Sequence, residues 1–282
     1  LKSITSSTPK PLLKFNNKSF LNYLIDFYIA HGVTNVLLLC SYKYNRFKSM
    51  YEKSKKYQKY VKCIKQDVPN GNLEALKISY KYLKKDFILC NGDTFINLKI
   101  DELIKYYFNN NRKTICVLTS NKKNISAKST LLSQKSLNKK ILITKKYRHK
   151  YANSGIYIFN KNILKKNKIK DYNSIENQFL PSLIKRNNIK FYKTNIEFKD
   201  IGTPKDFFKT SEFLLKNYPR PCAFLDRDGV INRDYGYVNK ISDFKWMPYI
   251  RNIIKHLNKK KYLIIVVSNQ SGVGRGYYPK KN

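Results

Sequence analysis

Acidic residues are scarce in this chain. It holds 18 Asp and Glu against 57 Lys and Arg, for a formal net charge of +39. The basic residues are spread along the whole chain, and Lys, Asn, Ile and Tyr are abundant together, which is typical of a genome-wide base-composition bias. A basic surface attracts anions. No zinc-finger spacing or aromatic RNA-binding signature is present, so we expect no specific nucleic-acid partner.

Cysteines are few and unpaired in sequence. None of the five forms a CxxC pair, and each stands alone in an apolar or β-prone run. This usage indicates reduced core thiols in a cytoplasmic protein and argues against a disulfide or metal site built from Cys40, Cys63, Cys90, Cys116 and Cys222.

Long apolar runs are also absent. No stretch approaches the ~18 uninterrupted apolar residues of a membrane span, and residues 1–11 hold no apolar core of signal-peptide length. We therefore expect a cytoplasmic protein that does not enter the membrane. Because the chain starts with Leu1, we also expect that its true N-terminus is missing.

Short β-prone runs alternate with amphipathic helical stretches along the first two thirds of the chain. This alternation predicts an α/β fold with a mostly parallel sheet and helices on both faces. The expected helices are 19–30, 43–53, 72–84, 101–109, 175–184 and 204–216. The expected strands are 35–40, 60–65, 87–91, 114–119, 141–144, 155–159 and 190–198, and the polar segment 121–140 is predicted to be a surface excursion.

A linker is predicted at 217–221, where NYPRP places two prolines in three residues. The βα pattern then restarts with a strand at 223–226, a helix at 249–258 and a strand at 262–268. We predict domains at 1–217 and 218–282. The second is shorter than the ~100 residues of a usual doubly wound domain, so we expect it to be the N-terminal part of one.

The strongest motif is FLDRDGV at 224–230. An apolar strand delivers Asp226 and Asp228, spaced i and i+2, so both carboxylates are expected on one side at the carboxyl end of the strand. Such a pair suits Mg²⁺, with one carboxylate attacking phosphorus and the other moving a proton. A second buried strand ends in SNQSG, where Ser268 and backbone N–H groups could hold phosphate oxygens.

These segments resemble the haloacid dehalogenase-like phosphatases, in particular the histidinol-phosphate and heptose-bisphosphate branch. The residues that carry the resemblance are DRDGVIN at 226–232, GYV at 236–238, WMP at 246–248 and SNQSGVGRGYY at 268–278. The resemblance implies Asp226 as nucleophile, Asp228 as general acid/base and Mg²⁺ at both. It also implies phosphate or substrate contacts for Ser268, Asn269 and Arg275. The family's later Lys, its acidic metal ligand and a Zn²⁺-binding loop would lie beyond Asn282.

Four weaker motifs follow one another in the first 217 residues. TPKPLL at 8–13 holds Lys10 rigidly between prolines, where it could meet a phosphate. NGD at 91–93 places Asp93 after a buried strand, and NSGIY at 153–157 opens another strand with Asn153. DIGTP at 200–204 offers a second carboxylate, Asp200, before a helix.

Together these motifs, with SYKY at 41–44, resemble the nucleotide-sugar pyrophosphorylases over residues 1–217, and within them the heptose 1-phosphate guanylyltransferases. The resemblance implies a Rossmann-like domain that uses an NTP, with GTP favoured, and a sugar 1-phosphate. It implies Mg²⁺ held by Asp93 and Asp200, phosphates held by Lys10, close backbone approach at Gly71, and the sugar touched by Asn153. The reaction would be in-line attack of a sugar phosphate oxygen on the α-phosphorus, with release of pyrophosphate.

Three departures from that family stand out. The Gly-rich GxGTR loop and first strand would precede Leu1. The Gly-rich segment reads PNGNLEA at 69–75, with only Gly71 retained, and ITKK stands at 143–146 in place of an acidic sugar-binding residue. The 282 residues by themselves are therefore expected to be catalytically impaired.

Three hypotheses remain open. The first is a bifunctional enzyme of activated-heptose biosynthesis, serving lipopolysaccharide or capsule, that removes the 7-phosphate of a heptose bisphosphate and activates the 1-phosphate. The second keeps both folds with another sugar phosphate or histidinol phosphate. The third is a nucleotide-sugar-binding module with a degenerate transferase domain. The oligomeric state is left open by the sequence.

Overall fold

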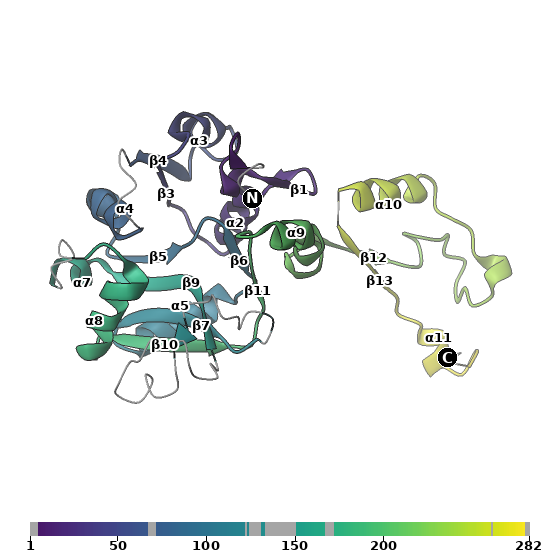
Figure 1. The fold of residues 1–282 in the computed structure, drawn as a ribbon. Helices are drawn as coiled ribbons and strands as arrows, with labels where there is room; N and C mark the ends of the chain where they lie inside the picture. The colour runs from purple at the N-terminus through teal and green to yellow at the C-terminus, as the bar shows by residue number, and fades with distance from the viewer. Residues whose placement is uncertain are drawn as a thin grey trace. The chain divides into compact units, whose positions relative to one another are not determined.

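The computed structural model describes residues 5–66, 72–121, 123, 131–132, 151–166, 172–260 and 262–279. The chain forms two compact units, Leu1–Tyr218 and Pro219–Asn282. Figure 1 shows the helices and strands of each unit.

The central sheet of the first unit is mixed. Its strand order is β10-β7-β9-β5, with the short β8 (Leu131–Leu132) beside β9. β10 is parallel to β7, whereas β9 runs antiparallel to both β7 and β5. The prediction of a mostly parallel sheet was therefore wrong here, because hydrophobic patterning reveals strands but not their directions. The bounds are β5 (Asp86–Cys90), β7 (Thr114–Thr119), β9 (Tyr151–Asn160) and β10 (Ile189–Thr194).

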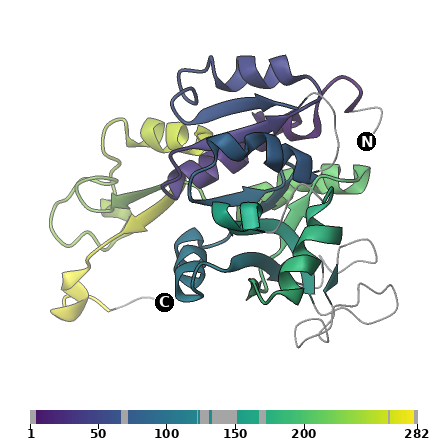
Figure 2. The same cartoon turned by 90° about the vertical axis from the view of Figure 1, so that its left-hand side faces the viewer.

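Both faces of this sheet are covered, as the alternation of side chains along β7 demonstrates. Ile115 and Val117 join one apolar cluster, while Cys116 and Leu118 join the other. The first cluster includes residues of α5 (Ile100–Asn109). The second includes residues of α4, α7 and α8 (Figures 1 and 2). These three helices are α4 (Asn72–Ser79), α7 (Lys161–Lys166) and α8 (Leu180–Lys185).

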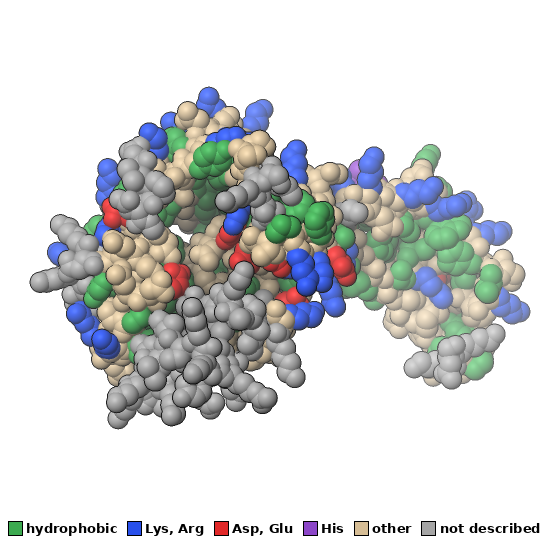
Figure 3. All heavy atoms as spheres, viewed as in Figure 1, with side chains coloured by type: hydrophobic (Ala, Val, Ile, Leu, Met, Phe, Trp, Pro, Cys, Tyr) green, Lys and Arg blue, Asp and Glu red, His purple; other side chains and the backbone are tan. Residues whose placement is uncertain are grey.

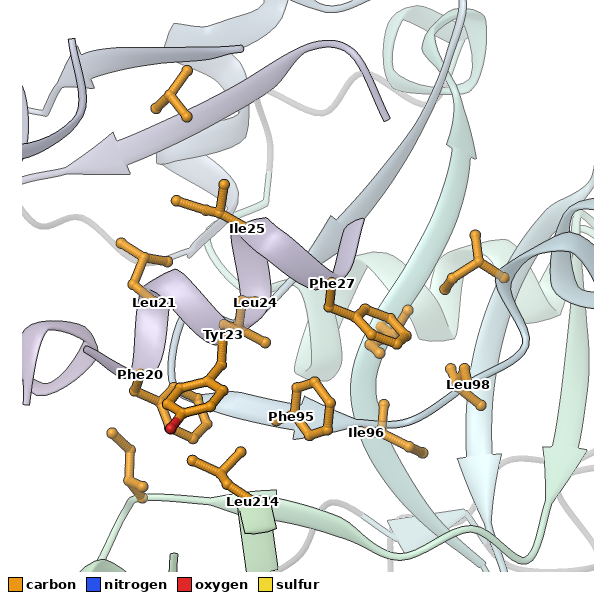
Figure 4. Packing of buried hydrophobic residues seen from close by; sticks show 14 of the residues in the cluster. Phe20, Leu21, Tyr23, Leu24, Ile25, Phe27, Phe95, Ile96, Leu98 and Leu214 are labelled. Atoms are coloured by element: carbon orange, nitrogen blue, oxygen red, sulfur yellow. The ribbon is translucent and has the colours of Figure 1, made fainter. Parts of the chain in front are cut away.

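Helix α2 (Phe20–Ala30) packs into the first cluster. Its start is capped by the Ser19 hydroxyl, which accepts a hydrogen bond from the Asn22 amide at 3.3 Å. Figure 4 shows Tyr23 and Phe27 of this helix on the side that faces β6 (Thr94–Ile96), where the rings of Phe27 and Phe95 meet edge to face at 5.3 Å. The helix is preceded by the hairpin of β1 (Lys14–Phe15) and β2 (Lys18–Ser19).

A parallel pair of strands, β3 (Val36–Cys40) and β4 (Val61–Lys65), stands beside α3 (Tyr44–Tyr51). All five residues of β3 and all five of β5 line an apolar cavity of about 590 Å³. In the part of the chain that the structure describes, β3 pairs only with β4 and β5 only with β9, so the cavity lies between two unpaired strand edges.

Two short strands position the polar residues of this unit. β6 (Thr94–Ile96) pairs antiparallel with β11 (Phe198–Asp200), and Asp200 lies opposite Thr94. Helix α9 (Pro204–Asn217) follows and is capped at its start by Thr203, whose hydroxyl accepts a hydrogen bond from the Asp206 amide. Short turns complete the unit: η1 (Lys10–Leu12), η2 (Tyr80–Tyr82) and the π-helical turn η4 (Ile175–Phe179).

The second unit is built around β12 (Cys222–Asp226) and β13 (Leu263–Val267), which run parallel. Phe224, Val266 and Val267 on these strands are 69%, 54% and 52% exposed, although parallel strands are ordinarily covered on both faces. The described residues thus do not show a closed haloacid dehalogenase-like domain. The remaining elements are η5 (Ile241–Asp243), α10 (Ile250–Lys259) and α11 (Ser271–Gly274).

Two expectations from composition can be compared with the structure. All five cysteines are free; Cys40, Cys63 and Cys116 are buried, as expected for core thiols, whereas Cys90 and Cys222 are only partly buried. Within the described ranges, no helix combines the length and the apolar character needed to cross a membrane.

Candidate functional site

Lys10, Asp93 and Asp200 come together at the carboxyl end of β5. Asp93 lies in the turn after β5, and Asp200 ends β11 on the neighbouring ladder. The Ile201 amide donates to the Asp93 carbonyl oxygen at 3.1 Å, which holds the two acidic segments side by side. Lys10 lies close enough for its charge to act on Asp200.

The electrostatics of Asp200 reflect this proximity. Burial raises the pKa of Asp200 to about 6, and the negative charge of Asp93 acts in the same direction. The Lys10 ammonium lowers the pKa, as does a hydrogen bond from the Gly202 backbone. Part of the Asp200 side chain still reaches solvent. Two carboxylates held together in this way favour a cation or a proton between them.

The Asp200 carboxylate lies close to Gly202, in space that a side chain at position 202 would otherwise occupy. A Cβ at Gly202 would lie 3.3 Å from both carboxylate oxygens of Asp200. A larger side chain would therefore press on the carboxylate. The glycine of the DIGTP segment is explained by this close approach.

A polar cavity of about 470 Å³ is lined on one side by Asp200. Asp200 and Asn153 both line it, so the structure brings these two predicted residues to one cavity. Four of the chain's 18 acidic residues line it, which is a strong concentration in so basic a chain, and acidic side chains gather in this region of Figure 3. These four are Glu176, Glu197, Asp200 and Asp206. No motif singled out Glu176, Glu197 or Asp206, because each is recognisable only through its place at the cavity.

Asn153 is held firmly within the bulged part of β9. Its Oδ1 accepts from the Gly155 amide at 3.0 Å, and its Nδ2 donates to the Tyr157 hydroxyl at 2.7 Å. Gly155 has φ +71°, and a Cβ there would lie 2.4 Å from Asn91 Nδ2. Glycine is therefore required in this segment by both backbone conformation and packing.

The carboxylate pair fits Mg²⁺ bound together with a nucleotide. The described residues contain no group of three or more His, Cys, Asp or Glu side chains placed to hold a metal ion. Mg²⁺ does not require such a group, since it is often held by one or two carboxylates with waters and substrate phosphates. Asp93 and Asp200 supply that donor set. Gly71, which the sequence analysis linked to the nucleotide, lies outside the described residues.

The second unit gathers a different set of predicted residues. Asp226 ends β12, and in the parallel ladder it lies opposite Val267, the residue before Ser268. The Gln270 side chain bridges the two segments, donating to Asp228 at 2.9 Å and to Ser268 at 2.6 Å. Asp226, Asp228 and Ser268 therefore belong to one strand-end site.

Asp228 is placed differently from the sequence-based expectation. The strand ends at Asp226, so Asp228 lies in the following turn and the i, i+2 argument for a continuous strand does not apply. Burial acts to raise the pKa of Asp228, but hydrogen bonds from Asn232, Arg227 and Gln270 lower it below the ordinary value. The Arg227 guanidinium donates to both carboxylate oxygens of Asp228, at 3.0 and 2.9 Å. Asp228 is therefore stabilised as a carboxylate.

The other two predicted residues of this unit are exposed. Arg275 donates to the Tyr237 hydroxyl at 2.7 Å, and Asn269 follows Ser268 in the exposed segment after β13. The predicted Zn²⁺ loop was placed beyond Asn282, outside the sequence.

Comparison with known proteins identifies the family of the first unit. The family model described as "Nucleotidyl transferase" matches residues 1–217. The chain belongs to the nucleotidyl transferase family. It is 28% identical over 227 residues to the D-glycero-alpha-D-manno-heptose 1-phosphate guanylyltransferase of Campylobacter jejuni, and this match covers 77% of the chain and 94% of that relative.

A solved structure agrees with this assignment. HddC from Yersinia pseudotuberculosis, in a complex with GMP-PN, superposes with a TM-score of 0.59 at 28% identity, covering 76% of this chain and 93% of that one. The α/β nucleotidyltransferase fold of the first unit is thus established.

Other relatives match a short part of the chain at higher identity. One such part is similar to the D-glycero-beta-D-manno-heptose-1,7-bisphosphate 7-phosphatase of Haemophilus ducreyi, with 44% identity over 62 residues, which is 22% of this chain. The chain spans about a third of that phosphatase's length.

Proposed function

We propose that the first unit transfers a nucleotidyl group from an NTP, with GTP favoured, to a heptose 1-phosphate. The observation that carries the proposal is the grouping of Lys10, Asp93 and Asp200 beside a polar cavity lined by Asn153. Both heptose and guanine are supported by the Campylobacter relative, which is named for that pair of substrates.

The residues divide into two tasks. Asp93 and Asp200 would hold Mg²⁺, which when bound neutralises triphosphate charge and orients the α-phosphate. Lys10 would hold phosphate oxygens as a point charge. A phosphate oxygen of the sugar 1-phosphate forms a new bond to the α-phosphorus while the bond from that phosphorus to the bridging oxygen breaks, and pyrophosphate leaves with the electron pair. The contribution of the chain is positioning and charge stabilisation.

The test is to incubate the full-length protein with Mg²⁺, GTP and heptose 1-phosphate and to measure pyrophosphate. We expect release that depends on both substrates and is lost in Asp93→Asn. Mannose 1-phosphate and the other three NTPs serve as competitors, because other relatives are mannose-1-phosphate guanyltransferases. Preference for another pair would replace the substrate assignment, whereas no turnover with any pair would support a binding module instead.

For the second unit we propose phosphatase chemistry on a sugar bisphosphate. The proposal is supported by the strand-end grouping of Asp226, Asp228 and Ser268 and by the partial match to heptose-bisphosphate phosphatases. Asp226 would attack phosphorus and release the sugar alcohol, giving an aspartyl-phosphate that water then hydrolyses. Asp228 would move the proton, and Mg²⁺ would be held at the Asp226 carboxylate. Phosphate release from heptose 1,7-bisphosphate, with histidinol phosphate as the alternative substrate, tests this assignment.

A further inference from the structure

Glu176 is a cavity-lining residue that none of the sequence motifs includes. It is the second residue of η4 and shares the polar cavity with Asn153 and Asp200. The described residues around it place donors on both of its carboxylate oxygens, and those contacts limit what it can bind.

Glu176 is the acceptor in both of the hydrogen bonds described here. The Tyr157 hydroxyl donates to Oε1 at 3.1 Å, and Asn72 Nδ2 donates to Oε2 at 2.8 Å. The Tyr157 oxygen in turn accepts from Asn153 Nδ2 at 2.7 Å. Asn72 is itself fixed, because its Oδ1 accepts from the Ile175 amide at 3.1 Å. Glu176 is thus held as an acceptor by residues from α4 and β9.

The backbone that carries Glu176 is unusual. η4 is a π-helical turn in which the Phe179 amide donates to the Ser174 carbonyl oxygen at 3.1 Å. π-Helical turns are rare in proteins, and those that occur are often found at functional sites. The wide turn places Glu176 at the cavity while Ile175 and Phe179 remain buried.

The burial of Tyr157 indicates that its hydrogen bond to Glu176 is part of the folded core and is not a chance surface contact. The residue is only 1% exposed, and burial raises the pKa of its phenol well above the ordinary value. A buried tyrosine hydroxyl needs partners. Among the residues that the structure describes, the hydrogen-bond partners of this hydroxyl are Asn153 and Glu176, and both line the cavity.

A carboxylate offers about four acceptor positions. Tyr157 and Asn72 occupy one on each oxygen of Glu176, which leaves positions for donors that enter the cavity. A triphosphate would be repelled by this charge, whereas neutral hydroxyl groups can donate to it. We infer that Glu176 recognises hydroxyl groups of the sugar substrate, and that Asn72, Tyr157 and Asn153 are positioning residues that orient its carboxylate. This inference rests on the proposed nucleotidyl transfer and adds the group that selects the sugar.

The inference gives Asn153 a different task from the one that the sequence suggested. Its side-chain oxygen and one of its two amide N–H groups are already used within the protein. The acidic residue that the sequence lacked at 143–146 is then supplied from a later segment of the chain.

The test compares Glu176→Gln with the unchanged protein, using heptose 1-phosphate, mannose 1-phosphate and an analogue of each that lacks one ring hydroxyl. We expect the KM for the sugar phosphate to rise roughly 10- to 100-fold, as for the loss of a hydrogen bond to a charged group. The KM for the NTP and kcat should change less than about threefold. The penalty for the missing hydroxyl should shrink in Glu176→Gln, because the variant has already lost the charged acceptor.

Two further variants separate recognition from folding. Tyr157→Phe retains the buried ring but removes a donor to Glu176, and should raise the sugar KM several-fold. Glu102→Gln, an exposed change on α5, should leave both KM values unaltered. An unchanged sugar KM and an undiminished hydroxyl penalty in a folded Glu176→Gln would overturn the inference while leaving the proposed function intact.

A failure of the proposed function has a different signature. If the protein turns over no sugar 1-phosphate, calorimetric binding of the same sugar phosphates decides the inference by itself. Binding that weakens in Glu176→Gln supports it, and equal binding or none overturns it.

Discussion

Asp93 and Asp200 lie next to each other at the carboxyl end of β5, joined by the hydrogen bond from the Ile201 amide to the Asp93 carbonyl oxygen. The charge of Asp93 adds to burial in raising the pKa of Asp200 to about 6. A carboxyl group of this kind ionises near neutral pH, so its charge can be changed by pH, by a cation or by removing its neighbour.

Cation binding should depend on pH. Because a cation requires the ionised form of Asp200, Mg²⁺ affinity should rise as pH increases through about 6 and level off above 7. Calorimetric titration with Mg²⁺ in the presence of a non-hydrolysable NTP, at pH 5.5 and 7.5, measures the difference. Asp200→Asn should abolish the pH dependence together with most of the affinity, and equal affinities at both pH values in the unchanged protein would contradict the assignment.

The same group predicts a dependence of stability on pH. A carboxyl whose pKa is raised on folding retains its proton in the native state at pH values where the unfolded chain has lost it. Its contribution is therefore most favourable below about 4 and is lost as pH rises to about 6. In metal-free buffer, Asp200→Asn should gain stability relative to the unchanged protein between pH 4 and 7 in urea unfolding. A stability difference that is flat over that range would argue against the raised pKa.

Asp93→Asn should separate stability from activity. It removes a like charge from beside Asp200, so the free energy of unfolding without metal should stay the same or increase. Turnover should fall about 100- to 1000-fold, as when an electrostatic group at a reacting centre is lost. Chemical denaturation and pyrophosphate release measured on one preparation provide both values, and full activity in this variant would remove Asp93 from the site.

Gly155→Ala tests the conformation of the β9 bulge. An alanine there would combine positive φ with a Cβ 2.4 Å from Asn91 Nδ2. Gly32→Ala is the matched control, because Gly32 has φ +83° with nothing within 4 Å of the added atom. We expect Gly32→Ala to cost about 1 kcal/mol, and Gly155→Ala to cost about 1 to 3 kcal/mol more. Equal losses in urea unfolding would mean that the Asn91 contact is unimportant.

Asp226→Asn should act on the second unit alone. The change removes the proposed nucleophile, so phosphate release from heptose 1,7-bisphosphate should fall to background. Nucleotidyl transfer from a pre-dephosphorylated sugar 1-phosphate should be unchanged. If phosphate release survived, the strand-end site of the second unit would not be the reacting site.

The longer helices and strands could be predicted from the sequence, because each depends on the residue pattern within its own segment. The helix over 19–30 was recognisable from its apolar spacing, and the structure adds the Ser19 cap at its start. The strands β5, β7, β12 and β13 were visible as β-prone apolar runs. Two three-residue strands, β6 and β11, were too short for periodicity to reveal, yet they hold Asp93 and Asp200 together.

Contacts between segments that are far apart in the sequence could not be predicted from local residue patterns. The antiparallel direction of β9 depends on how the chain returns to the sheet, and no residue pattern encodes it. The π-helical turn at Ile175–Phe179 looked like the start of an ordinary helix, since one extra residue in a turn does not alter a short apolar pattern. Glu176 was missed because its partner Asn72 lies 104 residues earlier.

The most direct measurement is the formation of GDP-heptose from GTP and heptose 1-phosphate by the full-length protein, followed together with pyrophosphate release in the unchanged protein and in Asp93→Asn and Asp200→Asn. We expect GDP-sugar and pyrophosphate to appear in equal amounts, only with Mg²⁺, and to be nearly absent in both variants. Equal rates in all three proteins, or nucleotide and sugar phosphate bound without product, would contradict the assignment of this carboxylate pair to nucleotidyl transfer.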